Sequence, residues 1–452
     1  MLRRPHIPTA LAFAVLACSG AGSDKSGFSG TDGSTLSDVD PGAEFAIPED
    51  AGGAPCVGLK CQQVTCSGSA TTSLSGTIYD PAGRTPLYNV IVYVPNAPLD
   101  PIPRPLSCDK CGAIASGSPI VAALTDAKGQ FVLKNVPVGK DIPLVMQVGK
   151  WRRRVVIPEV KECVDTPITD KELTRLPKSR KEGDIPQFAV TTGNADELEC
   201  FLREIGIDDS EFVAGGGKGA VHLFQGWGGS SVAGIPQASV FWSTYENLKY
   251  YDIVILSCEG AEHAETKPAA ATAAMMEYLD KGGRVFASHY HYYWFKNGPA
   301  ALQSTAKWTG GGTASPYLID MSFPKGKAFG EWLTNVGAST TPGEINLSAV
   351  MNNVGVVNPA TSQRWVYKTS GGESVKYMSF ATPVGKTKEE QCGRAVFSDI
   401  HISNSSGGGA FPSSCTGGSD FSPQEKALEF LLFDLSSCLQ ADGDPPKAPP
   451  VK

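Results

Sequence analysis

The sequence predicts a multidomain chain in which a small all-β sandwich precedes an α/β domain with an open, mostly parallel sheet. Residues 73–94 and 124–158 alternate apolar and polar side chains and break at turn residues, which is typical of strands joined by tight turns. Beyond residue 185, short apolar strands alternate with segments of helical periodicity, as in α/β domains. The chain of 452 residues is long enough for two or three domains.

The first residues have the pattern of an export signal. Arg3 and Arg4 precede an apolar run, 10–17, and Cys18 follows that run. The run is shorter than the roughly 20 residues that cross a bilayer as a helix. Residues 15–18, Val-Leu-Ala-Cys, resemble the bacterial lipobox, which implies removal of residues 1–17 and lipidation of Cys18. The alternative is an ordinary secretory signal with cleavage nearby.

Residues 18–70 are predicted to form a lipidated, flexible stalk with a cysteine cluster at its end. As far as residue 55 they are mainly Gly, Ser, Asp, Ala and Pro, which bury too little apolar surface to fold. Together with the lipid anchor, this composition places the chain in the cell envelope. We expect attachment to the outer membrane, facing the periplasm or the exterior.

The charge of the chain limits its partners. The formal net charge is −7, and it becomes more negative when Arg3 and Arg4 leave with the signal, so nucleic acid is not expected as a partner. The short basic clusters at 152–154 and 178–181 are interpreted as a solvated strand edge and a linker. The membrane is the expected partner of the anchor, and a glycan or an envelope protein is the expected partner of the folded part.

Cysteine is frequent in this chain. Twelve cysteines in an exported protein predict disulfides. With Cys18 acylated an odd number remains, so at least one thiol should be free or paired between chains. Cys108 and Cys111 form a CxxC, but the second CxxC that a zinc ribbon needs is absent, so a disulfide-pinned loop is favoured over zinc at that place.

Residues 71–164 carry the motifs of a known type of sandwich. The motif residues are Gly76, Pro86-Leu87, Thr125-Asp126-x-x-Gly129-x-Phe131 and Asn135-Val136-Pro137-x-Gly139. On these residues the segment resembles carboxypeptidase regulatory-like, transthyretin-like and Cna-B-like domains. The resemblance implies a β-sandwich that acts as a spacer, a stabilising module or a binder rather than a catalyst. A charged linker, 165–185, is expected to follow.

Residues 186–440 are predicted to form the α/β domain, and 441–452 a disordered tail. Apolar strands are expected at 186–193, 251–257, 284–288 and 392–403, and helices at 194–206, 268–281 and 422–437. Asn194 or Asp196 could cap the first helix, and Ser422 with Glu425 forms a capping box for the last one.

Polar residues gather where the expected strands end. Four of the six histidines of the chain follow strands: His263, His289, His291 and His401. Ligands of open parallel sheets bind at the carboxyl ends of the strands. Because side chains two apart on a strand share a face, His289 should accompany His291, and Asp399 should accompany His401.

The order of these elements resembles the class I glutamine amidotransferase-like superfamily, including the branch related to trehalose-utilisation proteins. The resemblance implies a flavodoxin-like sheet, a nucleophile after the strand 284–288 and a catalytic histidine at His401. The chain departs from the pattern, because Ser288 or His289 stands at the nucleophile turn and Ser403 replaces the orienting glutamate. The catalytic candidates Cys258, Glu259 and Ser288 therefore do not form the expected set, and a domain without catalysis is predicted.

Two chemical hypotheses remain for the strand ends. His289, His291, His401 and Asp399 offer three nitrogens and one oxygen, the ligand set of a hydrolytic zinc, with Glu259 or Glu262 as base. The alternative is that these histidines only hydrogen-bond inside a packed cluster with the tyrosines at 290, 292 and 293.

Aromatic residues among glycines suggest recognition of sugars. Trp227 and Trp242 are the candidates for carbohydrate binding, with core packing as the alternative. Taken together, the sequence predicts an envelope-anchored lipoprotein of binding or scaffolding type. The alternative is a metal-dependent hydrolase that acts on a carbohydrate or an amide.

Overall fold

The computed structural model describes residues 56–104, 106–313, 315–402, 409–415 and 420–451. The expected signal, the lipidation residue Cys18 and the stalk as far as residue 55 lie outside the described residues. Residues 56–452 group into one compact unit.

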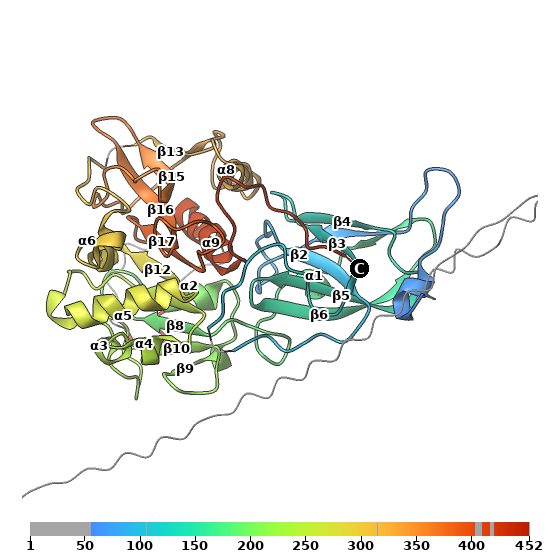
Figure 1. Cartoon of the computed structure of the whole chain (residues 1–452), viewed down its shortest axis with the longest axis horizontal. Coiled ribbons are helices and arrows are strands. Elements are labelled where there is room, and N and C mark those ends of the chain that lie inside the picture. The colour runs from blue at the N-terminus through green and yellow to red at the C-terminus, as the bar shows by residue number, and fades with distance from the viewer. Residues whose placement is uncertain (1–55, 105, 314, 403–408, 416–419, 452) are drawn as a thin grey trace, which may run out of the picture. The chain divides into compact units, whose positions relative to one another are not determined.

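The largest sheet has ten strands, and Figure 1 shows them following one another from β9 to β13. Six neighbours are parallel: β9 (Phe212–Ala214), β10 (Val221–Phe224), β8 (Phe188–Thr191), β11 (Ile253–Leu256), β12 (Arg284–Ser288) and β17 (Gly393–Ser398). Four more extend it in antiparallel fashion: β16 (Ser374–Thr382), β15 (Ser362–Lys368), β13 (Tyr317–Ile319) and β14 (Glu344–Ile345). The sheet is therefore mixed, and the expectation of a mostly parallel sheet describes only its larger part.

The inner parallel strands are continuous apolar segments because both of their faces are covered. Every residue of β8, β10, β11, β12 and β17 is buried. The order β10-β8-β11 places neighbours on both sides of β8, the first of these strands in the sequence. Such a switch in strand order opens a crevice at the carboxyl edge, where ligands of open sheets bind.

The helices are short apart from three. Those around the large sheet are α2 (Leu198–Glu204), α3 (Ala238–Phe241), α4 (Tyr245–Leu248), α5 (Ala269–Asp280), α6 (Tyr293–Lys296), α7 (Ala300–Gln303), α8 (Pro324–Asn335) and α9 (Pro423–Ser436). The capping box predicted for the last helix is confirmed, since Ser422 and Glu425 cap α9 reciprocally. The cap predicted for the first helix is wrong: α2 starts after Glu197 without a side-chain cap, and Asp196 binds elsewhere.

Two smaller sheets precede the large one. The first has the order β4-β1-β7, with β4 (Gln130–Lys134), β1 (Ser73–Thr77) and β7 (Asp165–Ile168). The second has the order β3-β2-β5-β6, with β3 (Pro119–Leu124), β2 (Ile91–Pro95), β5 (Gly139–Val148) and β6 (Trp151–Val160). The first residues of the expected linker therefore form a strand, β7, paired in parallel with β1, and α1 (Lys171–Thr174) follows it.

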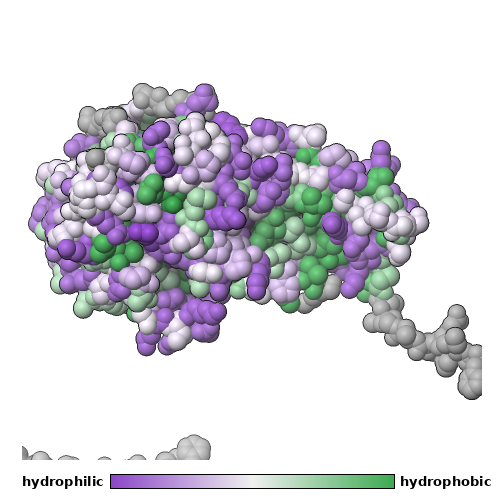
Figure 2. Space-filling model, turned by 90° about the horizontal axis from the view of Figure 1, so that it is seen from above, coloured by the Kyte–Doolittle hydropathy of each residue, from purple (hydrophilic) through white to green (hydrophobic). Residues whose placement is uncertain are grey.

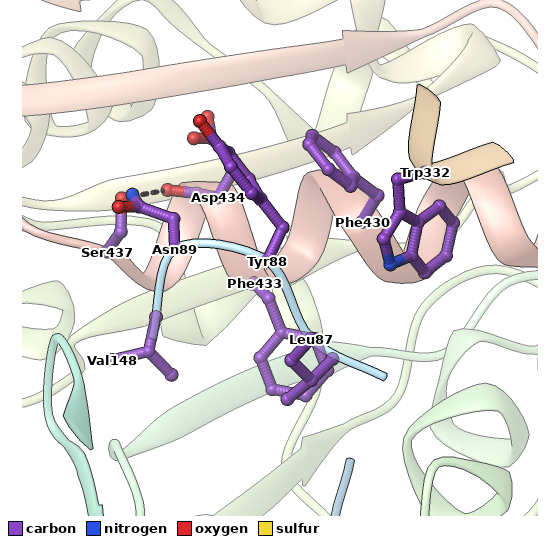
Figure 3. Close-up of a pocket in the computed structure, with 9 residues that line it drawn as sticks. All are labelled: Leu87, Tyr88, Asn89, Val148, Trp332, Phe430, Phe433, Asp434 and Ser437. Atoms are coloured by element: carbon purple, nitrogen blue, oxygen red, sulfur yellow. Dashed lines mark hydrogen bonds between the residues drawn. The ribbon is translucent and has the colours of Figure 1, made fainter. Parts of the chain in front are cut away.

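Apolar side chains join the small sheets to the large one. A single cluster of buried residues includes Leu74 and Val92 from the small sheets, Phe188 from the large sheet and Phe433 from α9. Figure 3 shows a narrow pocket at this junction, where the ring of Tyr88 stacks on Phe430 with centroids 5.6 Å apart. The small sheets and the large sheet therefore share one apolar core.

Five disulfides cross-link the described chain, as the cysteine count predicts. They join Cys56 to Cys61, Cys66 to Cys163, Cys108 to Cys392, Cys111 to Cys438 and Cys200 to Cys415. Both cysteines of the CxxC bind partners in the α/β part, so the loop is pinned and does not offer a zinc-ribbon half. Among the described residues only Cys258 is free.

Both ends of the described chain are tied to the fold. The end of the expected stalk, 56–70, contains a 3-10 helix, η1 (Gly58–Gln62), and the backbone of Gln62 accepts a hydrogen bond from Val138 at 2.9 Å. In the expected tail, the carboxylate of Asp442 pairs with buried Arg394 at 2.7 Å. Figure 2 shows one mostly hydrophilic face of the molecule, interrupted by an apolar area. Among the described residues, no helix has the length and apolar character needed to cross a membrane.

A buried pair of carboxyl groups lies at the junction and predicts a pH effect on stability. Burial raises the pKa of Asp80 to about 6, and burial together with the neighbouring Asp80 raises the pKa of Glu429 well above its ordinary value. The folded state therefore keeps protons that the unfolded state has released, so this pair destabilises the fold progressively as the pH rises from about 4 to 7. We expect Glu429→Gln to raise the free energy of unfolding by roughly 1–2 kcal/mol at pH 8 and by much less at pH 5. Urea unfolding of both proteins at the two pH values measures this difference, and an equal gain at both values would contradict the account.

Candidate metal centre

Three adjacent parallel strands deliver the residues of the centre. In the register of the sheet, Leu256 of β11 faces Ala287 of β12, and Ser288 faces Ser398 of β17. Cys258 comes two residues after β11, His289 directly after β12 and His401 three residues after β17. Since the carboxyl ends of parallel strands meet at one edge, these side chains lie together.

The three side chains converge on one point. The Nδ1 atom of His289 lies 3.4 Å from the Sγ atom of Cys258 and 2.9 Å from the Nε2 atom of His401. All three potential ligand atoms lie within 4.8 Å of one another. Within the part of the chain that the structure describes, no other group of three or more His, Cys, Asp or Glu side chains has this property.

The contacts of His289 distinguish a metal centre from a cysteine-histidine pair of catalytic type. A catalytic imidazole uses one nitrogen toward the nucleophile and the other toward the group that orients it. In this site the thiol and the second imidazole approach the same nitrogen, Nδ1. One nitrogen with two such neighbours is the arrangement expected around a shared ion.

The backbone turn at His289 directs its ring inward. His289 has a φ of 38°, in the left-handed region that non-glycine residues seldom adopt, and it opens the 3-10 helix η4 (His289–Tyr292). The turn follows directly on Ser288, the last residue of β12. Strain of this kind persists where the surroundings fix it, commonly at functional sites.

Burial sets the protonation of the three groups. It lowers the pKa of His289 to about 3 and that of His401 to about 4, and it raises the pKa of the Cys258 thiol to about 12. At neutral pH the site therefore holds two neutral imidazoles and a neutral thiol. Without a metal this thiol is a poor nucleophile, because the thiolate is the reactive form.

The shifted pKa values of these three groups predict how metal binding depends on pH. Both imidazoles are ready to bind without losing a proton, whereas the Cys258 thiol must lose one. We expect the logarithm of zinc affinity to rise by about one unit per pH unit between about pH 6 and 8. Chelator competition across that range measures the slope. A slope near zero, or near two, would show that a different set of groups titrates.

The donor atoms fit an ion of the zinc class. With Zn–S near 2.3 Å and Zn–N near 2.0 Å, the ligand atoms of a tetrahedral site lie roughly 3.3–3.6 Å apart. The observed separations of 3.4 and 2.9 Å from Nδ1 of His289 are close to those values, whereas the whole set spans up to 4.8 Å, so the ligands would have to draw together around an ion. Cys258, His289 and His401 would hold the ion, and a fourth tetrahedral position would remain for a ligand.

His291, which the sequence predicts as a ligand, lies apart from this cluster. Its Nε2 atom donates to the carbonyl oxygen of Ser257 at 2.8 Å, and its Nδ1 atom accepts from the indole of Trp294 at 3.0 Å. Both ring nitrogens are hydrogen-bonded within the core, so neither is free to bind a metal ion. The two-residue alternation fails because β12 ends at Ser288 and a 3-10 helix follows.

Asp399 also lies outside the cluster. Its carboxylate accepts hydrogen bonds from the backbone amides of Asn353 at 2.5 Å and Val354 at 3.3 Å. Burial raises its pKa to about 7. Because β17 ends at Ser398, Asp399 and His401 do not share a strand face, and Asp399 instead fixes the segment that contains Asn353.

The glutamates that were candidate bases have structural partners. Glu259 forms a buried ion pair with Lys267 at 2.6 Å and accepts the backbone amide of Trp227 at 3.0 Å. Burial opposes its ionisation, but the neighbouring His291 and Lys267 outweigh this and lower its pKa. Glu262 accepts a hydrogen bond from the hydroxyl of Tyr292.

Ser288 binds Asp196, a residue that the sequence analysis did not assign to the site. Its hydroxyl donates to Asp196, whose second oxygen accepts the amide of Ile402 at 2.9 Å. Burial raises the pKa of Asp196 to about 7. Asp196 therefore links the residue before His289 to the residue after His401. The sequence signal for this role was the position of Asp196 soon after the end of β8.

The two tryptophans do not form a common surface. Trp242 is buried, and its indole donates to the carbonyl oxygen of Thr266 at 2.8 Å, so it belongs to the core. Trp227 is 60% exposed and stacks on His263, with centroids 4.6 Å apart. Of the two candidates for carbohydrate binding, only Trp227 is placed to contact a ligand.

Comparison with protein-family models gives no match, and comparison with curated proteins gives none. Among solved structures, the chain is weakly similar to a ThuA-like protein from Bacteroides uniformis, at 12% identity over 54% of this chain and 88% of that chain, with a TM-score of 0.30. A cohesin–X-dockerin complex from Acetivibrio cellulolyticus matches 32% of this chain and 78% of that chain at 14% identity, with a TM-score of 0.16.

Proposed function

We propose that this chain is an envelope-anchored protein that binds a divalent transition metal ion of the zinc class through Cys258, His289 and His401. The observation that carries the proposal is the convergence of one sulfur and two nitrogen atoms within 4.8 Å at the carboxyl edge of three parallel strands. A thiolate with two imidazoles suits zinc better than magnesium or calcium, which prefer oxygen ligands.

Hydrolysis of a carbohydrate or an amide is the alternative use of this site. A bound ion of this kind polarises a carbonyl group and lowers the pKa of water. The chain would supply Tyr290, a half-buried ring whose centroid lies 4.0 Å from that of His289, to contact what enters. The backbone amide of Trp227 donates to Glu259, the neighbour of Cys258. The exposed ring of Trp227 would contact a more distant part of a substrate.

Binding or scaffolding without catalysis is the main proposal for the use of this centre, because the burial of the cluster favours it. Cys258 is 0% exposed and His289 is 7% exposed, which suits a metal that stabilises the fold. The two functions differ in one respect: a stabilising metal raises the unfolding temperature without any turnover. The smaller sheets would serve as a spacer or binding module, as the resemblance to carboxypeptidase regulatory-like sandwiches suggests.

Cobalt substitution tests the ligand set. Metal-free protein titrated with Co²⁺ should develop a thiolate-to-cobalt absorption in the near ultraviolet that saturates at one equivalent, and excess Zn²⁺ should abolish it. Cys258→Ser should fold and lack this absorption. Absence of the band in the wild-type protein, or its persistence in Cys258→Ser, would refute the proposed centre.

The anchor is a separate part of the proposal and rests on the sequence around Cys18. Mass spectrometry of the mature N-terminus after expression in a bacterial host tests it. A diacylglyceryl group on Cys18 is the expected result, and an unmodified chain that begins beyond Cys18 would end this part of the proposal without affecting the metal centre.

A further inference from the structure

A buried lysine at the same edge of the sheet has no counter-ion. Lys368, the last residue of β15, is 1% exposed. Among the described residues, no side chain or carbonyl oxygen makes a hydrogen bond or an ion pair with its ammonium group. Charged side chains are rarely buried without a partner, because removal from water costs far more than packing returns.

The acidic groups nearby already have partners. Asp399 accepts two backbone amides, and Glu373 pairs with Arg364 at 2.7 Å. A second buried lysine, Lys376, donates to Ser374 at 2.7 Å and to the carbonyl oxygen of Met351. Lys376 is thus satisfied, whereas Lys368 has no hydrogen-bond or ion-pair partner within the described part of the chain.

A glycine-rich loop lies against this ammonium group. A Cβ atom added to Gly312 would lie 3.1 Å from the Nζ atom of Lys368. Within the described chain, the backbone amides of Gly310, Gly311 and Gly312 donate no hydrogen bond to another backbone group. Backbone amides without an acceptor, beside a cation, are donors that an oxyanion can use.

The loop is connected to Asp399, which directly follows β17. The side chain of Asn352 donates to the carbonyl oxygen of Gly311 at 2.9 Å, and the next residue, Asn353, donates to Asp399. Since β15 and β17 are both antiparallel to β16, Lys368 and His401 lie at the same edge, two strand spacings apart, roughly 10 Å.

We infer that Lys368 and the loop 310–312 form a site for an oxyanion: the carboxylate, phosphate or sulfate group of a ligand. The site is separate from the metal ligands, and the inference does not depend on metal binding.

The test uses metal-free protein titrated with inorganic phosphate, sulfate or acetate, with sodium chloride at equal ionic strength as the reference. We expect a saturable rise in unfolding temperature beyond that of sodium chloride, with roughly millimolar affinity by calorimetry. A response to phosphate and sulfate supports a tetrahedral group, and a response to acetate alone supports a carboxylate. No saturable response to any of the three would overturn the inference.

Two variants and one control locate the site. Lys368→Met should bind at least roughly tenfold more weakly and yet unfold at a higher temperature without anion, because it removes an unpaired buried charge. Gly312→Ala keeps the charge but crowds the ammonium group, so it should also weaken binding. Lys327→Met, at an exposed position, is the control. Equal anion affinity in wild type, Lys368→Met and Gly312→Ala would place the binding elsewhere and refute the inference.

Discussion

Replacing Cys258 with alanine should lower zinc affinity by at least ~100-fold, because the variant loses the only thiolate among three ligands. Competition with a chromophoric chelator measures the effect. Ser257→Ala is the matched control, since Ser257 is the buried neighbour on the same strand end and its hydroxyl has no partner among the described residues. Equal loss of affinity in both variants would mean that the substitution acts through the fold rather than through the ligand.

Substitution of the two histidine ligands should also lower zinc affinity. His289→Ala and His401→Ala should lose zinc to a similar degree, whereas His291→Ala should retain one equivalent while its stability falls. The difference follows from geometry, because both nitrogens of His291 are already hydrogen-bonded within the core. A folded His291→Ala protein without metal would show that the ligand set is misassigned.

Removing the two disulfides of the CxxC loop should be the largest stability effect outside the core. Replacing Cys108 and Cys111, together with their partners Cys392 and Cys438, by alanine should lower the free energy of unfolding by roughly 3–5 kcal/mol, as measured by urea unfolding. The bonds close sequence separations of 284 and 327 residues, so they restrict the unfolded chain strongly. The two loops overlap along most of their length, and the second bond therefore adds less than the first.

A short-range disulfide provides the control for this effect. Cys56 and Cys61 are separated by 5 residues, so their replacement by alanine should cost less than half as much. Equal losses in the two variants would indicate that local packing around the bonds, and not restriction of the unfolded chain, determines their contribution.

The parallel part of the sheet was accessible from the sequence because its strands are buried on both faces. The segments 251–257 and 284–288 are continuous apolar runs and became β11 and β12. The antiparallel strands β15 and β16 were missed, although Gly371 and Gly372 mark the turn between them. Their side chains alternate less clearly, since buried lysines interrupt β15 and β16.

The candidate site could be predicted only as far as its strands. His289 and His401 were expected at neighbouring strand ends, and they lie together. The pairing of His289 with His291 assumed an extended backbone, but a positive φ at His289 ends the strand and turns His291 into the core. Cys258 lies beside His289 because β11 and β12 are neighbours in the sheet. The spacing of residues along the sequence does not show which strands are neighbours.

Elemental analysis of the purified wild-type protein tests the central claim most directly. Protein prepared without chelators, or metal-free protein after add-back and desalting, should hold about one equivalent of zinc or a similar divalent ion per chain. Less than about a tenth of an equivalent after add-back at neutral pH, in protein that is folded, would contradict the proposed centre of Cys258, His289 and His401.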